Sequence, residues 1–331
     1  MDSQIQNIEK IINADSIKET YKIIRAQLSY TDLKFSLPLS SLSKANVYIK
    51  EEQLQHTGSF KLRGVLSKIE SLGNIDSEKI FVAASTGNHA AAFAHVLETK
   101  KRKGVLFLPK NISKAKLEAL KGYSVTLHFF GENSVEAEAK ATAYAKEING
   151  ILIHPYNDVE IIKGQATIGL EIEAQLPNVD AVLVPVGGGG LASGIASFFQ
   201  NKRKVSVIGC QPYHASEMYD SIQNGNIVNP STKHTIADAS AGGIEDHAIT
   251  FELCKKYLSG FELLTEKQIK SAVAFMVKYH NTVIEPTAAL PIAALLNSTD
   301  YQGKNIVLVT TGRKIESLML KEILDKYDYN Y

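Results

Sequence analysis

The stretch QHTGSFKLRGV, residues 55–65, places a lysine where a reactive amine could work. Lys61 follows Phe60 and lies between Gly58 and Gly64, where a helix is predicted to begin. A lysine amine attacks an aldehyde only when it is partly deprotonated, which burial, nearby cations and the positive end of a helix dipole all favour. The segment predicts a reactive lysine, although by itself it also suits an ordinary helix start.

A second segment, VDAVLVPVGGGGLASGIASFF, predicts a strand, then the four glycines Gly187–Gly190, then a helix. Backbone N–H groups that no side chain covers, aimed by a helix N-terminus, form an anion site, and phosphate is the usual ligand. Consecutive glycines can also serve a tight turn. Four of them between a strand and a helix favour the phosphate site.

The surroundings of the glycines limit which phosphate compound can bind. Gly187, Gly189 and Ala192 satisfy the GxGxxG/A spacing, but the next strand ends at Gln211, without the acidic residue that would hold a dinucleotide's ribose. No Gly-Lys-Ser/Thr follows, so the P-loop pattern fails as well. A smaller cofactor with one phosphate remains, and it needs a protein anchor elsewhere. Lys61 could anchor pyridoxal phosphate, whose aldehyde forms a Schiff base with a lysine amine.

Short apolar runs alternate with helical stretches along most of the chain. Seven runs predict buried parallel strands: KIFVAAS, KGVLFLP, YSVTLHFF, GILIHP, DAVLVPV, KVSVIGC and NIVLVTT. Helices are the usual connection between parallel strands, so the alternation predicts an α/β fold of open sheets covered by helices. Three strands run into loops of small and polar residues, at the edge where such sheets bind ligands: ASTGNHAAA, PVGGGGLASG and TTGRKIES.

The composition favours a globular protein with a small-molecule partner. Its 331 residues suffice for two domains, and 36 Lys and Arg against 35 Asp and Glu leave a net charge of +1, with no field to attract nucleic acid or membrane. Its two cysteines, Cys210 and Cys254, lack the spacing of a zinc site and argue against a disulfide framework. Because no signal-like or membrane-spanning apolar run occurs, we expect a cytoplasmic protein.

Six motifs follow one another as they do in a known family: KEEQLQHTGSFKLRG, ASTGNHAAA, HPYNDVEIIKGQATIGLEI, VPVGGGGLASGIA, IEPTAA and TTGRKI. From about residue 37 to residue 316 the chain resembles the pyridoxal-phosphate enzymes of fold type II. It is most similar to the threonine/serine dehydratases and serine racemases. The stretch TIADASAGGIEDHAITFELC resembles a dehydratase-like branch associated with hydroxyectoine utilisation.

The resemblance implies residues that hold the cofactor, pyridoxal 5'-phosphate. Lys61 would form the Schiff base and remove the substrate α-proton, with Phe60 against the pyridine ring. Thr311 would face the pyridine nitrogen, where a neutral hydroxyl restrains the ring as an electron sink and favours β-elimination over transamination. The further cofactor contacts implied are Asn88 at the phenolic oxygen, the amides of Gly187, Gly188, Gly189, Gly190 and Leu191 at the phosphate, and Glu285.

The resemblance also implies a substrate site at a helix N-terminus, where anions such as a carboxylate bind well. Thr86 is in addition a catalytic candidate, because in racemases a serine there acts as the acid on the opposite face; the extra methyl and stiffer χ1 of threonine disfavour racemisation. Tyr156 resembles the aromatic residue of the dehydratases, and Ala239 replaces a glycine usual beside the cofactor. The implied substrate residues are Ser85, Thr86, Asn88, His89, Tyr156 and Ala239.

Taken singly, several of these residues also suit structural roles. The chain also lacks part of a metal site that is frequent in the family. Asn88 could be a helix cap, His89 a core histidine, Thr311 a turn residue and Glu285 a buried structural carboxylate. A divalent-cation site frequent in the family normally uses two carboxylates, but here only Glu217 remains, because glutamine replaces the other. We therefore expect no tight Mg²⁺ or Ca²⁺ site.

These observations predict two α/β domains of the tryptophan synthase β-like fold, with the cofactor between them. The large domain would comprise residues 1–79 and 155–331, and the small mobile domain residues 80–154. The predicted activity is that of an ammonia-lyase (dehydratase) that converts L-threonine, L-serine or a related β-hydroxy amino acid to a 2-oxo acid and ammonia. The alternatives are an amino-acid racemase and a non-catalytic binding protein. The resemblance further implies a homodimer.

Overall fold

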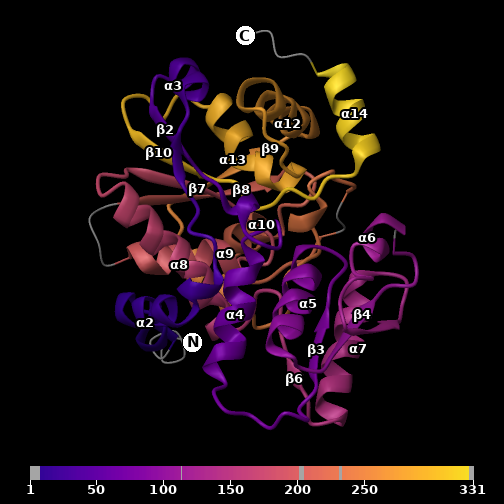
Figure 1. Cartoon of the computed structure of the whole chain (residues 1–331). Helices are drawn as coiled ribbons and strands as arrows, with labels where there is room; N and C mark the ends of the chain where they lie inside the picture. The colour runs from indigo at the N-terminus through magenta and orange to yellow at the C-terminus, as the bar shows by residue number, and fades with distance from the viewer. Residues whose placement is uncertain (1–7, 113, 201–204, 231–232, 328–331) are drawn as a thin grey trace.

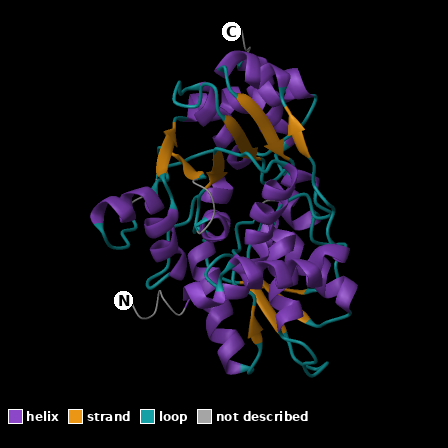
Figure 2. Ribbon diagram, turned by 90° about the vertical axis from the view of Figure 1, so that its left-hand side faces the viewer, coloured by secondary structure: helices purple, strands orange, loops and turns teal. Residues whose placement is uncertain are grey.

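The computed structural model describes residues 8–112, 114–200, 205–230 and 233–327. Its strands form two sheets, which Figure 2 shows as two separate groups of strands with helices between and around them. The larger sheet has six strands in the order β1-β2-β10-β7-β8-β9, and the smaller has four in the order β5-β4-β3-β6. Within both sheets every pairing is parallel except that of β1 with β2. The predicted α/β class with mainly parallel sheets is confirmed.

The strands follow the apolar runs of the sequence. The large sheet contains β1 (Leu33–Phe35), β2 (Asn46–Lys50), β7 (Ala181–Pro185), β8 (Ser206–Pro212), β9 (Gly260–Leu264) and β10 (Asn305–Val309). The small sheet contains β3 (Phe81–Ala84), β4 (Gly104–Leu108), β5 (Thr126–Phe129) and β6 (Ile151–Leu152). Each of the seven predicted runs forms a strand, whereas β1, β2 and β9 were not predicted.

The helices begin where polar side chains can cap them. The side chain of Asp158 accepts hydrogen bonds from two N–H groups in the first turn of α8, and Thr265 with Gln268 forms a capping box at α12. The helices are α2 (Ala14–Ile24), α3 (Leu37–Ser43), α4 (Lys61–Ser71), α5 (Asn88–Lys100), α6 (Lys114–Glu118), α7 (Ser134–Glu147), α8 (Val159–Gln175), α9 (Gly190–Phe199), α10 (Glu217–Asn224), α11 (Ile249–Tyr257), α12 (Glu266–His280), α13 (Pro286–Leu296) and α14 (Ser317–Lys326). Short 3₁₀ turns occur at Arg25–Gln27 (η1), Glu52–Leu54 (η2) and Asp238–Ser240 (η3).

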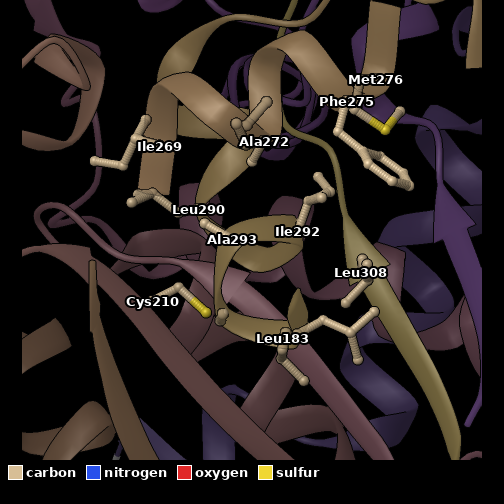
Figure 3. Close-up of a cluster of buried hydrophobic side chains, with 14 of the residues drawn as sticks. Leu183, Cys210, Ile269, Ala272, Phe275, Met276, Leu290, Ile292, Ala293 and Leu308 are labelled. Carbon is tan, nitrogen blue, oxygen red and sulfur yellow. The ribbon is translucent and has the colours of Figure 1, made fainter. Parts of the chain in front are cut away.

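The central strands β7 and β10 of the large sheet are buried on both faces, so their successive side chains enter two different cores. Leu183 and Leu308 point into a core with helices α12 and α13, which Figure 3 shows packed over the sheet through Phe275, Leu290 and Ile292. The alternate strand residues, among them Val182, Val184, Val307 and Val309, pack on the other face against α8 and α9. Burial on both faces explains why these strands are continuous apolar runs.

The small sheet is covered by helices from different parts of the chain (Figure 1). Phe81 and Ala83 pack with α4 and α5, and Val82 and Ala84 pack against an alanine face of α7. Helix α4 therefore contributes to the core of the small sheet while its other side packs on α8. Within the described ranges, no helix combines the length and apolar character needed to cross a membrane.

Candidate active site

Lys61 is the first residue of α4, and two backbone contacts set its place between the sheets. The N–H of Phe60 donates to the carbonyl of Thr311, just beyond β10, at 3.1 Å. The Lys61 Nζ donates to the carbonyl oxygen of Pro155, ahead of α8, at 2.6 Å, and lies 5.2 Å from the centre of the Phe60 ring. The fold thus brings Lys61, Phe60 and Thr311 close together, and their predicted contacts with a cofactor stay predictions.

The environment of Lys61 favours its neutral form. Burial lowers the pKa of Lys61 to about 8, against the opposing charges of Glu138 and Glu285. At pH 7 an amine with such a pKa is neutral in roughly one molecule in ten, about two hundred to three hundred times the fraction expected at the ordinary lysine pKa. Lys61 can therefore act as a nucleophile and as a base near neutral pH.

The glycine loop joins β7 to α9 and is packed from behind. A Cβ on Gly188 would lie 2.5 Å from the ring of Tyr156, and one on Gly187 would lie 3.0 Å from the Cα of Ser240. Gly189 adopts a left-handed φ of +86°, which strains any other residue. Because the first N–H groups of a helix lack partners within it, the amides at Gly190 and Leu191 remain available to an anion.

Asn88 and Glu285 meet beside Gly312, in the loop after β10. The Asn88 Nδ2 donates to both carboxylate oxygens of Glu285, at 2.8 and 2.9 Å. Burial raises the pKa of Glu285 to about 7, although the Asn88 hydrogen bonds act in the opposite direction. The Asn88 Oδ1 and the Thr311 Oγ1 are buried and have no hydrogen-bond partner in the described part of the chain. Buried polar atoms without partners are expected where a polar ligand completes the site.

The loop after β3 carries the predicted substrate residues. Ser85 and Thr86 are half-buried, and the Ser85 hydroxyl accepts from the N–H of Gly87 at 3.2 Å. His89 is buried, its Nε2 donates to the carbonyl of Ile153 at 2.9 Å, and burial lowers its pKa to about 3. The ring is therefore neutral and its other nitrogen can only accept. A contact between His89 and a substrate carboxylate stays a prediction that this hydrogen bond does not favour.

Tyr156 and Ala239 lie beside the glycine loop in different ways. The Tyr156 ring packs behind Gly188 and its Cβ behind Gly190, and its hydroxyl accepts from the N–H of Glu245 at 3.0 Å. Ala239 is exposed in η3, whose next residue packs against the glycine loop. The contacts of Tyr156 are those of a support for the loop, and its predicted part in substrate binding remains a prediction, as does that of Ala239.

Several residues of this region were not singled out from the sequence. The negative charge of Glu138, on α7, favours the ammonium form of Lys61. His154 lies 3.1 Å from the carboxylate of Glu245. The carbonyl of Pro155 is a backbone group, which no residue type reveals. Only the motif HPYND could have drawn attention to His154.

The predicted absence of a cation site concerns the region of Gln211 and Glu217. The Gln211 Oε1 accepts from the N–H of Tyr219 at 2.9 Å, and burial raises the pKa of Glu217. Across the described ranges, no group of three or more His, Cys, Asp or Glu side chains is gathered to hold a metal. The expectation stays a prediction.

Known proteins resemble this chain over nearly its whole length. Residues 24–312 match the family described as pyridoxal-phosphate dependent enzyme. The chain is 33% identical to the L-threonine ammonia-lyase of Thermotoga maritima over 317 residues, which cover 96% of this chain and 79% of that protein. Its structure is similar to that of threonine deaminase isoform 2 from Solanum lycopersicum, with a TM-score of 0.87, 29% identity and coverage of 94% of this chain and 88% of that one. It is also similar to serine racemase from Dictyostelium discoideum, with a TM-score of 0.83, 29% identity and coverage of 92% and 99%.

Proposed function

The chain belongs to the family of pyridoxal-phosphate dependent enzymes, and from this premise we propose that it is an ammonia-lyase. Its substrate is L-threonine, L-serine or a related β-hydroxy amino acid, which it converts to a 2-oxo acid and ammonia. The single observation that carries the proposal is the place of the Lys61 amine: Lys61 begins α4, its Nζ donates to the carbonyl of Pro155, and the N–H of Phe60 before it donates to the loop after β10.

The residues present fit pyridoxal 5'-phosphate. The glycine loop packs so closely on Tyr156 and Ser240 that side chains would not fit there, which leaves backbone amides to bind a phosphate, and the buried Thr311 hydroxyl has no partner within the described residues. Lys61 would hold the aldehyde carbon covalently, and Thr311 would lie beside the ring nitrogen. The remaining assignments are Phe60 against the ring, Asn88 and Glu285 at its phenolic side, and the amides of Gly187, Gly188, Gly189, Gly190 and Leu191 at the phosphate.

The reaction uses groups of the chain in sequence. When bound, the cofactor supplies an electron sink for the charge that develops at the substrate α-carbon. The loop Ser85–Asn88 binds the substrate carboxylate at the N-terminus of α5, where anions are stabilised. Once displaced from the aldehyde carbon by the substrate amine, the neutral Lys61 amine would take the α-proton, and its pKa of about 8 suits a base that works near neutral pH. The negative charges of Glu138 and Glu285 stabilise the ammonium that results.

A racemase is the second candidate, favoured by the similarity to the Dictyostelium serine racemase. Racemisation needs an acid on the face of the substrate opposite Lys61, and Thr86 is the residue proposed for it. The methyl of threonine restricts where its hydroxyl can point, so we place elimination first.

Further proposals concern the domains, the assembly and the compartment. The strands between residues 81 and 152 form a sheet of their own, which supports a small mobile domain of residues 80–154 and a large domain of residues 1–79 and 155–331. Phe35, Leu37 and Leu42 expose 47%, 67% and 41% of their surface within eight residues of chain, which supports a homodimer that covers them. Two free, buried cysteines suit a reducing cytoplasm.

An assay of 2-oxo acid formation from L-serine, L-threonine and 3-hydroxyaspartate tests the activity. We expect turnover of at least one of them, visible absorbance from lysine-bound cofactor in the purified protein, and loss of both in Lys61→Ala. Chiral analysis of the remaining serine separates lyase from racemase. A cofactor-replete protein that leaves all three substrates unchanged in amount and in configuration would instead support a binding protein.

A further inference from the structure

Four charged side chains are buried together between α4, α8 and β2. Lys50, Glu52, Arg63 and Glu171, which we call the buried quartet, each expose no more than 1% of their side-chain surface. Two positive and two negative charges balance, which is the condition under which charges are tolerated in a protein interior. The quartet lies outside the residues assigned above to cofactor and substrate.

Arg63 binds both carboxylates of the quartet through its guanidinium. Its Nε and Nη2 donate to the two oxygens of Glu52 at 2.8 and 2.7 Å. Its Nη1 and Nη2 donate to the two oxygens of Glu171 at 2.9 and 2.8 Å, and Nη1 also donates to the hydroxyl of Thr167 at 3.1 Å. Paired bonds of this kind fix direction as well as distance.

Lys50 completes the arrangement from the end of β2. Its Nζ donates to Glu171 Oε2 at 2.6 Å and to the carbonyl of Thr31 at 2.6 Å. Glu171 is therefore held by an arginine from one element and a lysine from another. Sliding α8 along α4 would break directional bonds in a place that water does not reach.

The quartet connects the helix that carries Lys61 with the helix that follows its hydrogen-bond acceptor. Arg63 lies two residues after Lys61 in the first turn of α4, and Glu171 lies on α8, which begins four residues after Pro155. The helices touch at their backbones, since a Cβ on Gly164 would lie 2.5 Å from the Arg63 carbonyl oxygen. The contact of Gly164 with Gly64 sets how close α8 and α4 come. Such a contact is not directional, so by itself it does not prevent one helix from sliding along the other.

We infer that Arg63 is a positioning residue: the buried quartet fixes the register of α4 against α8 and so holds the Lys61 amine at the Pro155 carbonyl, away from bulk water. The catalytic meaning of this inference rests on the proposed function, in which Lys61 is the base. The inference itself concerns the position of the Lys61 amine, which can be measured without any enzymatic activity.

The charges that act on Lys61 come from outside the quartet. They are Glu138 on α7 and Glu285 before α13. Arg63→Lys keeps the charge of the quartet and removes the fork, so any change at Lys61 in this variant reports its placement and not a lost charge. Thr167→Val is a milder variant that removes one acceptor of Arg63 and no charge.

The test is the pH dependence of Lys61 acylation in the full-length chain after removal of the cofactor, with the modified lysine identified by peptide mapping. In the unchanged protein we expect a midpoint near pH 8. In Arg63→Lys the amine gains water, so the midpoint rises towards the ordinary lysine value of 10.5. A rise of one pH unit lowers reactivity at pH 8 roughly five-fold. In Thr167→Val the midpoint should rise as well, but by less.

In the holoenzyme, kcat should fall more than KM changes, because the base and not the substrate loop is displaced.

Lys68→Met provides the matched control, because Lys68 pairs with Asp158 across the same two helices at 2.6 Å, with 19% and 18% of the side chains exposed. It should lower Tm and leave the midpoint in place. Midpoints that stay near pH 8 in both Arg63→Lys and Thr167→Val while Tm falls, or an equal shift in Lys68→Met, would overturn the inference. An ordinary midpoint in the unchanged protein would overturn the proposed role of Lys61 itself, and this inference with it.

Discussion

Asn88 and Glu285, 197 residues apart in the chain, are joined by two hydrogen bonds of 2.8 and 2.9 Å. Asn88 begins α5, which packs on the small sheet, and Glu285 precedes α13, which packs on the large sheet. The contact therefore spans the two sheets at the site proposed for the cofactor. It also holds a buried carboxyl group whose pKa, about 7, lies within the physiological range.

This pKa predicts that the protein loses stability as the pH rises, and that Glu285→Gln reduces the loss. The Glu285 pKa is raised from 4.5 to about 7, so the folded state binds a proton more tightly than the unfolded chain. The resulting penalty is absent well below pH 4.5, grows as the pH rises and is fully present above about pH 7. Between pH 5 and pH 8 it amounts to about 2 to 3 kcal/mol of unfolding free energy.

Denaturant unfolding of both proteins at pH 5 and pH 8 measures the effect. The fall in unfolding free energy between these pH values should be smaller in Glu285→Gln by that amount. Glu316→Gln, at an exposed position, should behave as the unchanged protein. Equal pH dependence in Glu285→Gln and the unchanged protein would show that the carboxyl titrates normally.

The fold was predictable wherever burial made the sequence pattern strong. The seven predicted strands are mostly continuous apolar runs, because helices cover both faces of their sheets. Two of the three strands that were missed carry weaker patterns: β1 has only three residues and is partly exposed, and β9 is only partly buried along four of its five residues. Short strands with an open side resemble loops in composition.

The site was predictable where a residue type itself limits the chemistry. The sequence alone reveals a lysine, consecutive glycines and an asparagine at a helix start. The structure brings Lys61, Asn88 and the glycine loop into one region. The carbonyl of Pro155 carries no signal, since every residue has one. Arg63 stands in plain view within the first motif, but its partner Glu171 is 108 residues away, and nothing in the sequence pairs them.

Gly188→Ala should weaken cofactor binding. The added methyl would lie 2.5 Å from the Tyr156 ring, so the ring or the loop must move, and the amides of the loop move with it. Overpacking of this kind typically costs about 1 to 3 kcal/mol, and we expect a loss of that size in the free energy of cofactor binding. Titration of the cofactor-free protein with pyridoxal phosphate, followed by absorbance, measures the affinity.

Gly122→Ala is the control for this substitution, because a methyl there meets no atom within 4 Å. Its affinity and Tm should match those of the unchanged protein. Unaltered affinity in Gly188→Ala would mean that the phosphate is held elsewhere than at the glycine loop.

Glu138→Gln should lower the pKa of Lys61 below its value of about 8. The negative charge of Glu138 favours the ammonium form of Lys61, and burial acts against it, so removing the charge leaves burial less opposed. The neutral fraction at pH 7 then rises, and the acylation midpoint of Lys61 in the cofactor-free protein moves to lower pH.

Glu147→Gln, an exposed position at the far end of the same helix, should leave this midpoint in place. A midpoint that moves to higher pH in Glu138→Gln would contradict the assigned sign. The same measurement also separates charge from placement, since Arg63→Lys shifts the midpoint in the opposite direction.

Thr86→Ser should increase racemisation relative to elimination. Thr86 is half-buried in the loop between β3 and α5, and its methyl limits the rotamers in which the hydroxyl can reach the substrate. Serine removes that restriction and provides a mobile hydroxyl as the acid opposite Lys61.

A positioned acid contributes typically about 10²- to 10⁴-fold to a proton transfer, so a well-placed serine should raise the rate of D-serine formation from L-serine by at least the lower part of that range. Chiral chromatography of serine, with 2-oxo acid measured in the same samples, gives both rates, and Thr86→Ala controls for the loss of the methyl without a hydroxyl. Equal D-serine formation in the serine and alanine variants would show that this hydroxyl does not reach the substrate, and would leave elimination as the only reaction that these residues support.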